Sequence, residues 1–461
     1  MDTIISRIIE PKSQIDESKK RFTNRDLRRL IVPLFFEQLL VMLVGIADTM
    51  MVSFAGEAAV SGVSLVNMLN IVFINLFTAL ASGGAVVVSQ YIGSGDRKKG
   101  NRSAGQLMMM VSLFSVAMML IALMFSRPLL GALFGRVDGD VMAACATYLR
   151  ISAYSYPAIA LYGAGAALYR SLRRTNVTMF ISIAANIINV VGNAIGIFAL
   201  KAGVAGVAYP TLIARAFSAV VIFALCFQRR NEVSLEWRHI FAVDMQIIRR
   251  LLRIAVPNAI ESGMFQLAKV ALSSITALFG TIQIAANGVA QSFWSMAALI
   301  GVSMGPAFMT VIGQCMGAGD AEAADYYMRK LLRITFIASI AWNLLIFIGV
   351  FPAMKLYALS PETVSLVITL VLIHNVFNAL FFPLAGPFPS GLRAAGDVQF
   401  PMYTAIFTTV ICRVALSYAF AIGLNLGVIG IAYAMCADWV IKAVMMAAHH
   451  RSGKWMRHKV I

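Results

Sequence analysis

The sequence has 461 residues, of which 60% are hydrophobic and only 13% are charged. Soluble chains average about 45–50% apolar and about 25% charged residues, so this composition excludes a water-soluble globular protein, and a mean hydropathy of +0.80 over the whole chain excludes a protein with a single membrane anchor. The formal net charge of +17 comes from basic residues spread over many loops, which argues against a nucleic-acid-binding surface.

Twelve apolar segments follow one another along the chain, each long enough for the roughly 20 residues that cross the hydrocarbon core of a bilayer. Their continuous apolar runs predict helices, because the strands of membrane barrels alternate weakly over about 10 residues. The expected fold class is therefore all-α, a polytopic membrane protein with 12 transmembrane helices. These helices are predicted at residues 30–54, 63–91, 105–126, 141–169, 176–199, 205–227, 251–279, 284–313, 331–351, 363–391, 400–422 and 428–449.

Basic residues are distributed unequally between alternate loops. With the N-terminus in the cytoplasm, the inside segments carry 29 of the 38 Lys and Arg residues and the outside segments carry 4. This bias predicts that both termini are cytoplasmic and that the number of crossings is even. The first 29 residues are polar and lack a signal-peptide pattern, so we expect the first helix to direct the chain to the plasma (inner) membrane. Five basic residues lie within predicted helices, namely Arg150, Arg215, Lys269, Arg413 and Lys442.

The two halves of the chain resemble each other at an offset of 224 residues. VVVSQYIGSGDRKKG (86–100) aligns with TVIGQCMGAGDAEAA (310–324), VPLFFEQ (32–38) with VPNAIES (256–262), and GVAGVAY (203–209) with GVIGIAY (427–433). Three separated matches at one offset predict two pseudo-symmetric six-helix bundles, with a substrate cavity between them. The expected domains are a cytoplasmic segment at 1–29, an N-lobe at 30–227, a cytoplasmic linker at 228–250, a C-lobe at 251–449 and a cytoplasmic tail at 450–461.

Several motifs occur together in the order and spacing of one transporter family. They are Pro33 and Asp48 in the first predicted helix, the GSGD (93–96) and GAGD (317–320) loops, the ALYRSLRR (167–174) and SGLRAAGD (390–397) loops, and Asn186, Asn189 and Asn193 in the fifth helix. With these motifs the chain resembles the multidrug and toxic compound extrusion (MATE) family of the MOP flippase superfamily, and is closer to the DinF-like branch than to NorM. The resemblance implies a secondary transporter that is driven by H⁺ or Na⁺.

Asp48 lies in the middle of the first predicted helix, with no basic residue near it in sequence. A charge at that depth costs about 2.5–3.5 kcal/mol on insertion scales, so intramembrane acids mark functional sites. Such a carboxylate is either protonated or charged beside a bound cation, and both states suit ion coupling. The resemblance implies that the N-terminal lobe of the family binds H⁺ or Na⁺ at this aspartate. The alternative is a hydrogen-bonded carboxylate with a packing role only.

Asn189 and Asn193 are four residues apart, so they share one face of the fifth helix and can offer carbonyl oxygens to a hard cation such as Na⁺. In the DinF-like and archaeal members that this chain resembles, the position of Asn193 is commonly aspartate, which leaves the choice between Na⁺ and H⁺ open here. Thr211 matches a further site position of the family and completes the expected ion-coupling set with Asp48. Interhelical hydrogen bonding is the alternative for the asparagines, and a bond to its own backbone is the alternative for Thr211.

The repeat pairs Glu37 with Glu261, each four residues after a proline that is expected to bend its helix. We expect these two acids, with Gln38 and Gln266, to line the substrate cavity and to hold a cationic, amphipathic molecule. In the alternative interpretation, Glu261 pairs with Lys269 on the same helix, which makes Lys269 a structural charge.

The remaining intramembrane polar residues are interpreted as structural. Arg413 is expected to be a buried clamp in the C-lobe that needs an acidic partner. Asp438 is expected to pair with Lys442, one helical turn away, and His374 to be hydrogen-bonded or to face the pore. The cysteines are scattered without metal-ligand spacing, so we expect no metal site and no cofactor other than the coupling ion.

The function expected from these features is multidrug efflux by cation-coupled antiport, with alternating access between two bundles. The expected partners are small cationic amphipathic molecules and the lipid bilayer, with no nucleic acid, and the protein is expected to be a monomer. A flippase for lipid-linked or polysaccharide precursors is the main rival, and it needs a more cationic cleft. A major facilitator matches the loop GSGDRKKGNR only superficially, and an enzyme is not expected because no nucleophile with a base, metal cluster or paired acids at a membrane boundary is visible.

Overall fold

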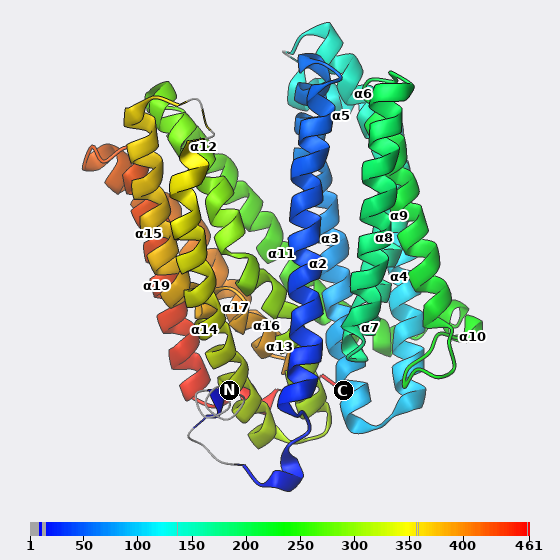
Figure 1. Ribbon diagram of the computed structural model, residues 1–461. Coiled ribbons are helices and arrows are strands. Elements are labelled where there is room, and N and C mark those ends of the chain that lie inside the picture. The colour runs from blue at the N-terminus through cyan, green and yellow to red at the C-terminus, as the bar shows by residue number, and fades with distance from the viewer. Residues whose placement is uncertain (1–8, 12–14, 136, 356, 358, 459) are drawn as a thin grey trace. The chain divides into compact units, whose positions relative to one another are not determined.

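The computed structural model describes residues 9–11, 15–135, 137–355, 357, 359–458 and 460–461 (Figure 1). All regular secondary structure in this part of the chain is helical, which confirms the predicted all-α class. Parts of the predicted N-terminal segment, with Arg136 and Lys459 from the count of loop charges, lie outside the described residues.

The chain forms two compact units. The N-terminal unit comprises Arg28–Ala259, and the C-terminal unit comprises Ile260–Ile461 together with the described part of Met1–Leu27. Helix α11 (Met245–Thr276) begins in the first unit and ends in the second. The predicted linker 228–250 lies within the N-terminal unit.

Each predicted span of the N-terminal unit falls on helical residues. The fourth span is divided in two, because α6 ends at Tyr154 and α7 begins at Tyr156 with Pro157 in its first turn, where the missing backbone N–H of proline does no harm. Two short helices, α5 (Ser126–Phe134) and α10 (Trp237–Phe241), lie in segments predicted as loops. The long elements are α2 (Asn24–Ser53), α3 (Glu57–Ser94), α4 (Arg97–Met124), α6 (Gly139–Tyr154), α7 (Tyr156–Ser171), α8 (Thr175–Ala194) with the π-helical segment η2 (Ile195–Ala199), and α9 (Ala205–Cys226).

The C-terminal unit also has a helix at every predicted span, with more breaks. Span 284–313 is divided at Ala298, and span 363–391 is divided near Pro387. Its elements after α11 are α12 (Gly280–Ala297), α13 (Leu299–Gly317), α14 (Ala321–Met354), α15 (Pro361–Ala385), α16 (Phe388–Ala394), α17 (Gln399–Ala405), η3 (Ile406–Cys412), α18 (Arg413–Tyr418), η4 (Ala419–Gly423) and α19 (Val428–Arg451).

Among the described residues, 10 helical stretches are long and apolar enough to cross a membrane. The other two predicted spans fall on the divided α6 and α7 and on α11, whose span contains charged residues. Many large apolar side chains on these helices are exposed, for example Leu113, Met124, Leu344 and Ile348. A helix that faces lipid must expose apolar side chains along its length, so these exposed residues agree with a position in the membrane.

The GSGD and GAGD loops join consecutive helices in each unit with the same backbone geometry. Gly95 and Gly319 follow the ends of α3 and α13 with a φ of 76°, a left-handed conformation that favours glycine. Asp96 and Asp320 then accept a hydrogen bond from the backbone N–H of the third residue of the next helix, at 3.0 Å and 2.9 Å respectively. These aspartates are N-caps, which stabilise the start of α4 and α14.

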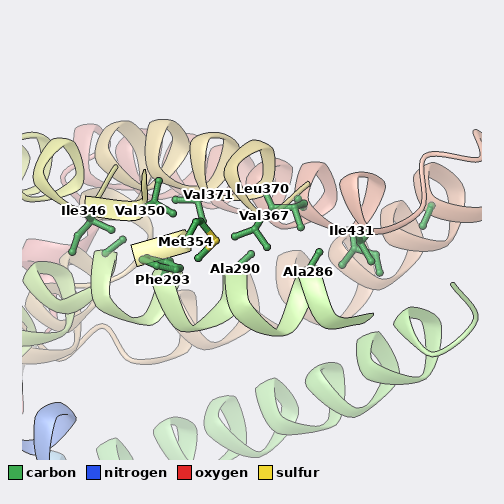
Figure 2. Packing of buried hydrophobic residues seen from close by; sticks show 14 residues of the cluster. Ala286, Ala290, Phe293, Ile346, Val350, Met354, Val367, Leu370, Val371 and Ile431 are labelled. Carbon is green, nitrogen blue, oxygen red and sulfur yellow. The ribbon is translucent and has the colours of Figure 1, made fainter. Parts of the chain in front are cut away.

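Small and large apolar residues alternate in the core of the C-terminal unit. Figure 2 shows Ala286 and Ala290 of α12 facing Val367 and Leu370 of α15, with Val350 of α14 beside them. The small side chains of α12 allow its backbone to approach the neighbouring helices closely, as packed transmembrane helices require. A similar core in the N-terminal unit joins α2, α3, α6 and α9.

Candidate functional site

Helices α8 and α9 pack along each other in the N-terminal unit (Figure 1). They approach very closely where η2 meets the start of α9, because a Cβ placed on Gly196 would lie only 2.2 Å from the carbonyl oxygen of Gly206. One turn further along, a Cβ on Gly192 would lie 2.6 Å from Pro210. This glycine contact brings the polar faces of the two helices into hydrogen-bonding range.

The four residues predicted as the ion-coupling set form one hydrogen-bonded chain across three helices. Asn193 of α8 donates through Nδ2 to Oδ1 of Asp48 on α2 at 2.7 Å, and more weakly to Oδ1 of Asn189 at 3.4 Å. Asn189 donates to Oγ1 of Thr211 on α9 at 2.9 Å, and Thr211 donates to the backbone carbonyl of Val207. Asn189 and Asn193 are 5% and 0% exposed, so these bonds form in a desolvated environment.

This chain of hydrogen bonds lies beside a cavity of about 300 Å³ within the N-terminal unit. Asp48, Asn189 and Thr211 line it together with Tyr162 and Asn186. The Asn193 Oδ1 and Asn186 Nδ2 atoms are buried and have no hydrogen-bond partner among the described residues. An acidic side chain, the unpaired amide of Asn186 and other polar side chains in one cavity indicate a binding site for a small polar or charged species. In the described part of the chain, no cluster of three His, Cys, Asp or Glu side chains is arranged to hold a metal ion.

Arg215 of α9 lines the same cavity and was not assigned to the site by the sequence. Its guanidinium donates to Ser155 Oγ at 2.8 Å, and its charge acts on Asp48 although the two side chains form no ion pair within 4.0 Å. The available signal was its place among the five intramembrane basic residues, one turn after Thr211 on the same face of its helix. The cavity therefore holds one acidic and one basic side chain.

Glu37, which the sequence analysis assigned to the substrate cavity, is 3% exposed and makes three contacts within the N-terminal unit. Arg170 of α7 forms an ion pair with it at 2.7 Å, Thr178 donates to its other oxygen at 2.9 Å, and Tyr162 donates at 3.4 Å. Its partner Arg170 belongs to the ALYRSLRR motif. The motif and the acid after Pro33 are thus joined in space.

Glu261 repeats this arrangement in the C-terminal unit. It forms an ion pair with Arg393 of the SGLRAAGD motif, and not with Lys269 as the alternative interpretation had it. Lys269 instead lies with its Nζ 5.2 Å from the centroid of the Phe265 ring. Gln38 and Gln266, the other two residues proposed for the substrate cavity, are half-buried and line neither of the cavities described within the two units.

The C-terminal unit has a cavity of its own, also of about 300 Å³, which Arg413, Lys269 and His374 line. Arg413 forms a buried ion pair with Asp438 at 3.0 Å, which supplies the acidic partner that a clamp requires. This contact corrects the expected pairing of Asp438 with Lys442. His374 is 1% exposed, and neither ring nitrogen has a hydrogen-bond partner among the described residues. Of the two alternatives predicted for this histidine, the hydrogen bond is therefore not found, and the side chain lines the cavity.

Comparison with known proteins identifies the family of the chain. The family model MatE matches residues 33–195 and 257–419, one copy for each half of the chain. The two matched segments begin at corresponding positions of the internal repeat that the sequence predicts.

Two relatives and one solved structure illustrate the similarity. "Uncharacterized transporter YisQ" of Bacillus subtilis is 28% identical over 92% of this chain and 93% of its own length. "Probable multidrug resistance protein NorM" of Thermotoga maritima is 23% identical over 98% of this chain and 96% of its own length. An outward-facing multidrug resistance MATE family transporter of the MOP superfamily superposes with a TM-score of 0.86, at 20% identity and 97% coverage of each chain.

Proposed function

The chain belongs to the MatE family, and we propose that it is a secondary multidrug transporter that exports amphipathic organic molecules, organic cations among them, by antiport against an inward-moving cation. Its relatives are transporters and its helices are those of a multi-pass membrane protein. The observation that carries the proposal is the Asp48 carboxylate, held by Asn193 at the wall of a cavity in the N-terminal unit. We assign Asp48 as the coupling group.

The surroundings of Asp48 favour H⁺ over Na⁺ as the coupling ion. A sodium ion needs several oxygen ligands and a net attraction for positive charge, as other hard cations do. Here Asp48 is the one carboxylate among the described residues that line the cavity, and the fixed positive charge of Arg215 lies in the same cavity and opposes a second cation. A proton needs only one lone pair of the carboxylate, and it removes the charge of Asp48 without requiring further ligands.

Protonation of Asp48 changes the contacts between α2 and α8. The charge-assisted hydrogen bond from Asn193 is about twice as strong as a neutral one, so loss of the carboxylate charge weakens the link between the two helices. We propose that this weakening shifts α2 and biases alternating access. For one ion exchanged against one uncharged substrate molecule, a membrane potential of 100 mV supplies about 2.3 kcal/mol, which sustains a roughly fifty-fold substrate gradient. Exchange of one proton for one monovalent organic cation moves no net charge, so the pH gradient alone drives it.

The test is efflux of ethidium from proteoliposomes under a pH gradient alone and under a sodium gradient alone. We expect the pH gradient to drive efflux by the wild type and the sodium gradient at constant pH to drive little. Asp48→Asn keeps the size of the side chain and removes its ability to take up a proton, so coupled efflux is expected to be lost. Asp140→Asn makes the same change at an exposed position at the start of α6 and is the matched control.

If Asp48→Asn transports like the wild type at equal protein density, Asp48 is not the coupling group. If the sodium gradient drives efflux as well as the pH gradient does, the assignment to H⁺ is wrong while antiport stands. Asp140→Asn must transport like the wild type. If both variants lose transport, the loss in Asp48→Asn does not report on coupling.

Flippase activity on lipid-linked precursors is the second candidate function, and one observation favours it. The C-terminal cavity contains Lys269 and Arg413 and is cationic, as recognition of a pyrophosphate requires. Arg413 is neutralised by Asp438, however, so a single uncompensated cation would face a group with several negative charges. A small cavity with one free positive charge fits a single acidic group better, so export of small molecules is the preferred proposal.

The remaining expectations from the sequence are part of this proposal. We propose that the protein acts in the plasma membrane with both termini in the cytoplasm, as the excess of basic residues in alternate loops indicates. We also propose that it works as a monomer and uses no cofactor besides the coupling ion.

A further inference from the structure

The internal repeat places a cavity in each unit, and the two cavities differ in charge: the N-terminal one is lined by one acid and one base, the C-terminal one by two bases and, among the described residues, no acid. At the offset of 224 residues, Asp48 in the N-terminal cavity corresponds to Leu272 in the C-terminal cavity, and Asn189 corresponds to Arg413. Gly45, which lines the N-terminal cavity, corresponds to Lys269. The C-terminal cavity has thus lost the acid at the position of Asp48 and gained two bases.

One of these two bases has no acidic partner. Arg413 forms its ion pair with Asp438, so its charge is compensated within the C-terminal unit. Among the described residues, no acidic side chain forms an ion pair with Lys269, which is exposed and whose Nζ lies over the Phe265 ring. A cation at membrane depth without an acid is costly, and an anionic ligand is the partner that would remove this cost.

The unpaired polar atoms around this cavity are mainly hydrogen-bond donors. Arg413 Nε and Trp294 Nε1 each carry a hydrogen and are buried without a partner in the described part of the chain. His374, which is 1% exposed, carries a hydrogen on at least one of its two unpaired ring nitrogens. The hydroxyl groups of Ser273 and Ser295, by contrast, donate to backbone carbonyls of their own helices. The buried unpaired donors of the wall therefore suit accepting groups such as carboxylate oxygens, while Asn287 and Gln291 offer both donors and acceptors.

The rest of the wall is partly polar, with Thr276, Asn287 and Gln291, and otherwise apolar and aromatic. Phe265, Leu272, Ile431 and Met435 line the cavity, and Trp294 lies stacked on Trp439 at its edge. A volume of about 300 Å³ is at the lower end for ligand pockets. The chemistry and the size together fit a molecule with one acidic group and an aromatic ring system of one or two rings.

We propose that the cavity of the C-terminal unit binds the carboxylate of a small aromatic acid, with Lys269 as the charged partner and Arg413, Trp294 and His374 as donors. The binding site itself does not depend on the transport mechanism. Its role as a substrate site rests on the proposed function, and it extends the exported molecules to aromatic acids and to zwitterions.

The binding test uses the full chain in phosphatidylcholine nanodiscs and three probes of one shape, titrated by calorimetry. The probes are 2-naphthoate, neutral 2-naphthamide and cationic 2-naphthylmethylammonium. We expect 2-naphthoate to bind tightest and the cation weakest. Lys269→Met is expected to weaken 2-naphthoate binding roughly tenfold or more, because one charged hydrogen bond is lost, and to leave 2-naphthamide unaffected.

Two further variants keep the test informative. Lys442→Met removes another intramembrane lysine of the same unit that does not line the cavity, and it should bind 2-naphthoate like the wild type. Lys269→Glu should reverse the preference toward 2-naphthylmethylammonium. Equal affinity of the wild type for 2-naphthoate and 2-naphthamide, or unchanged 2-naphthoate binding by Lys269→Met, would overturn the proposal.

A lipid headgroup offers the same anionic chemistry, and a second nanodisc separates the two sources. If phosphatidylglycerol in the disc abolishes 2-naphthoate binding, the site belongs to lipid and its assignment to aromatic acids is wrong. Transport distinguishes the remaining cases. Binding of 2-naphthoate without its export by proteoliposomes retains the site and removes its substrate role, whereas export of ethidium without any 2-naphthoate binding removes the site and leaves the proposed function intact.

Discussion

Asn193 donates an amide N–H to the Asp48 carboxylate at 2.7 Å, while its own Oδ1 is buried and has no partner among the described residues. The two ends of an amide are nearly equal in size, so a half-turn of the Asn193 side chain presents an oxygen at the same position. Asn193 can therefore donate to the charged carboxylate and accept from the protonated one. An aspartate at this position cannot donate when it is charged, which makes asparagine suited to a proton site.

The first prediction concerns Asn193→Asp. This variant replaces the donor with a second carboxylate and makes the cavity more attractive to Na⁺. A neighbouring charge in a partly buried site is worth more than about 1.4 kcal/mol, so Na⁺ should bind at least roughly tenfold tighter than to the wild type. The measurement is the midpoint of thermal unfolding in NaCl compared with KCl, in which only the variant should be stabilised by Na⁺.

Asn176→Asp is the matched control, because Asn176 is exposed on the same helix and away from the cavity. It should show no difference between the two salts. A sodium-specific stabilisation of the wild type equal to that of Asn193→Asp would contradict the proton assignment.

The second prediction concerns Arg215, whose fixed charge opposes cation binding in the N-terminal cavity. Arg215→Met removes the repulsion between the guanidinium and a cation bound in the cavity. We expect the variant to bind Na⁺ detectably by calorimetry where the wild type does not. Arg150→Met removes an exposed charge from α6 in the same unit and should behave as the wild type. Absence of Na⁺ binding by Arg215→Met would mean that the ligand geometry, rather than charge, excludes this ion.

Most of the fold is predictable from the sequence, because transmembrane helices need long apolar runs that local composition reveals. The breaks inside the runs are less visible. The division at Ser155 has Pro157 as its signal, but the division of span 284–313 at Ala298 has no proline or glycine at the break itself. A break of this kind depends on the packing of neighbouring helices, which composition does not record.

The candidate site was predictable where helical spacing and the family resemblance acted together. Asn189 and Asn193 share a face by spacing, and the resemblance supplied Asp48 as their partner. Arg215 was recognisable as an intramembrane charge, but its position beside Asp48 depends on the close contact of α8 and α9. The partner of Glu37 was also not predictable from the sequence, because Arg170 lies on another helix and far away in sequence.

The third prediction concerns the buried pair of Glu37 and Arg170. Removing one member of a buried pair leaves an uncompensated charge and costs about 3–5 kcal/mol, whereas replacing both members costs far less. Glu37→Gln should therefore lower the midpoint of thermal unfolding more than the double variant Glu37→Gln/Arg170→Gln does. The comparison is made with purified protein in one detergent by intrinsic fluorescence.

The pseudo-symmetric pair of Glu261 and Arg393 provides the control for this prediction. Its side chains are 24% and 12% exposed, against 4% and 20% for Glu37 and Arg170, so its acid is better solvated. Glu261→Gln should destabilise less than Glu37→Gln. Equal effects of the two single variants would show that burial of the acid does not decide the cost.

The fourth prediction concerns the N-cap of α4. The backbone N–H of Lys99 donates to Asp96, and this bond, with the nearby lysine charges, lowers the pKa of Asp96 although partial burial acts in the opposite direction. A carboxyl with a lowered pKa in the folded state stabilises that state above its unfolded pKa of about 3.9, and the contribution is lost as the pH falls through the folded pKa. Asp96→Ala should lower the free energy of unfolding by about 1 kcal/mol at neutral pH.

The pH dependence of this difference separates a charged cap from a general packing effect. Midpoints of thermal unfolding of the wild type and Asp96→Ala should differ by a constant amount above about pH 5 and converge as the pH falls below about 3.9, because the protonated aspartate is a poorer acceptor. Asp96→Asn retains an acceptor oxygen without the titrating charge, so its difference from Asp96→Ala should persist at low pH. A gap between wild type and Asp96→Ala that stays constant over the acid range would show that the charge of Asp96 contributes nothing to the start of α4.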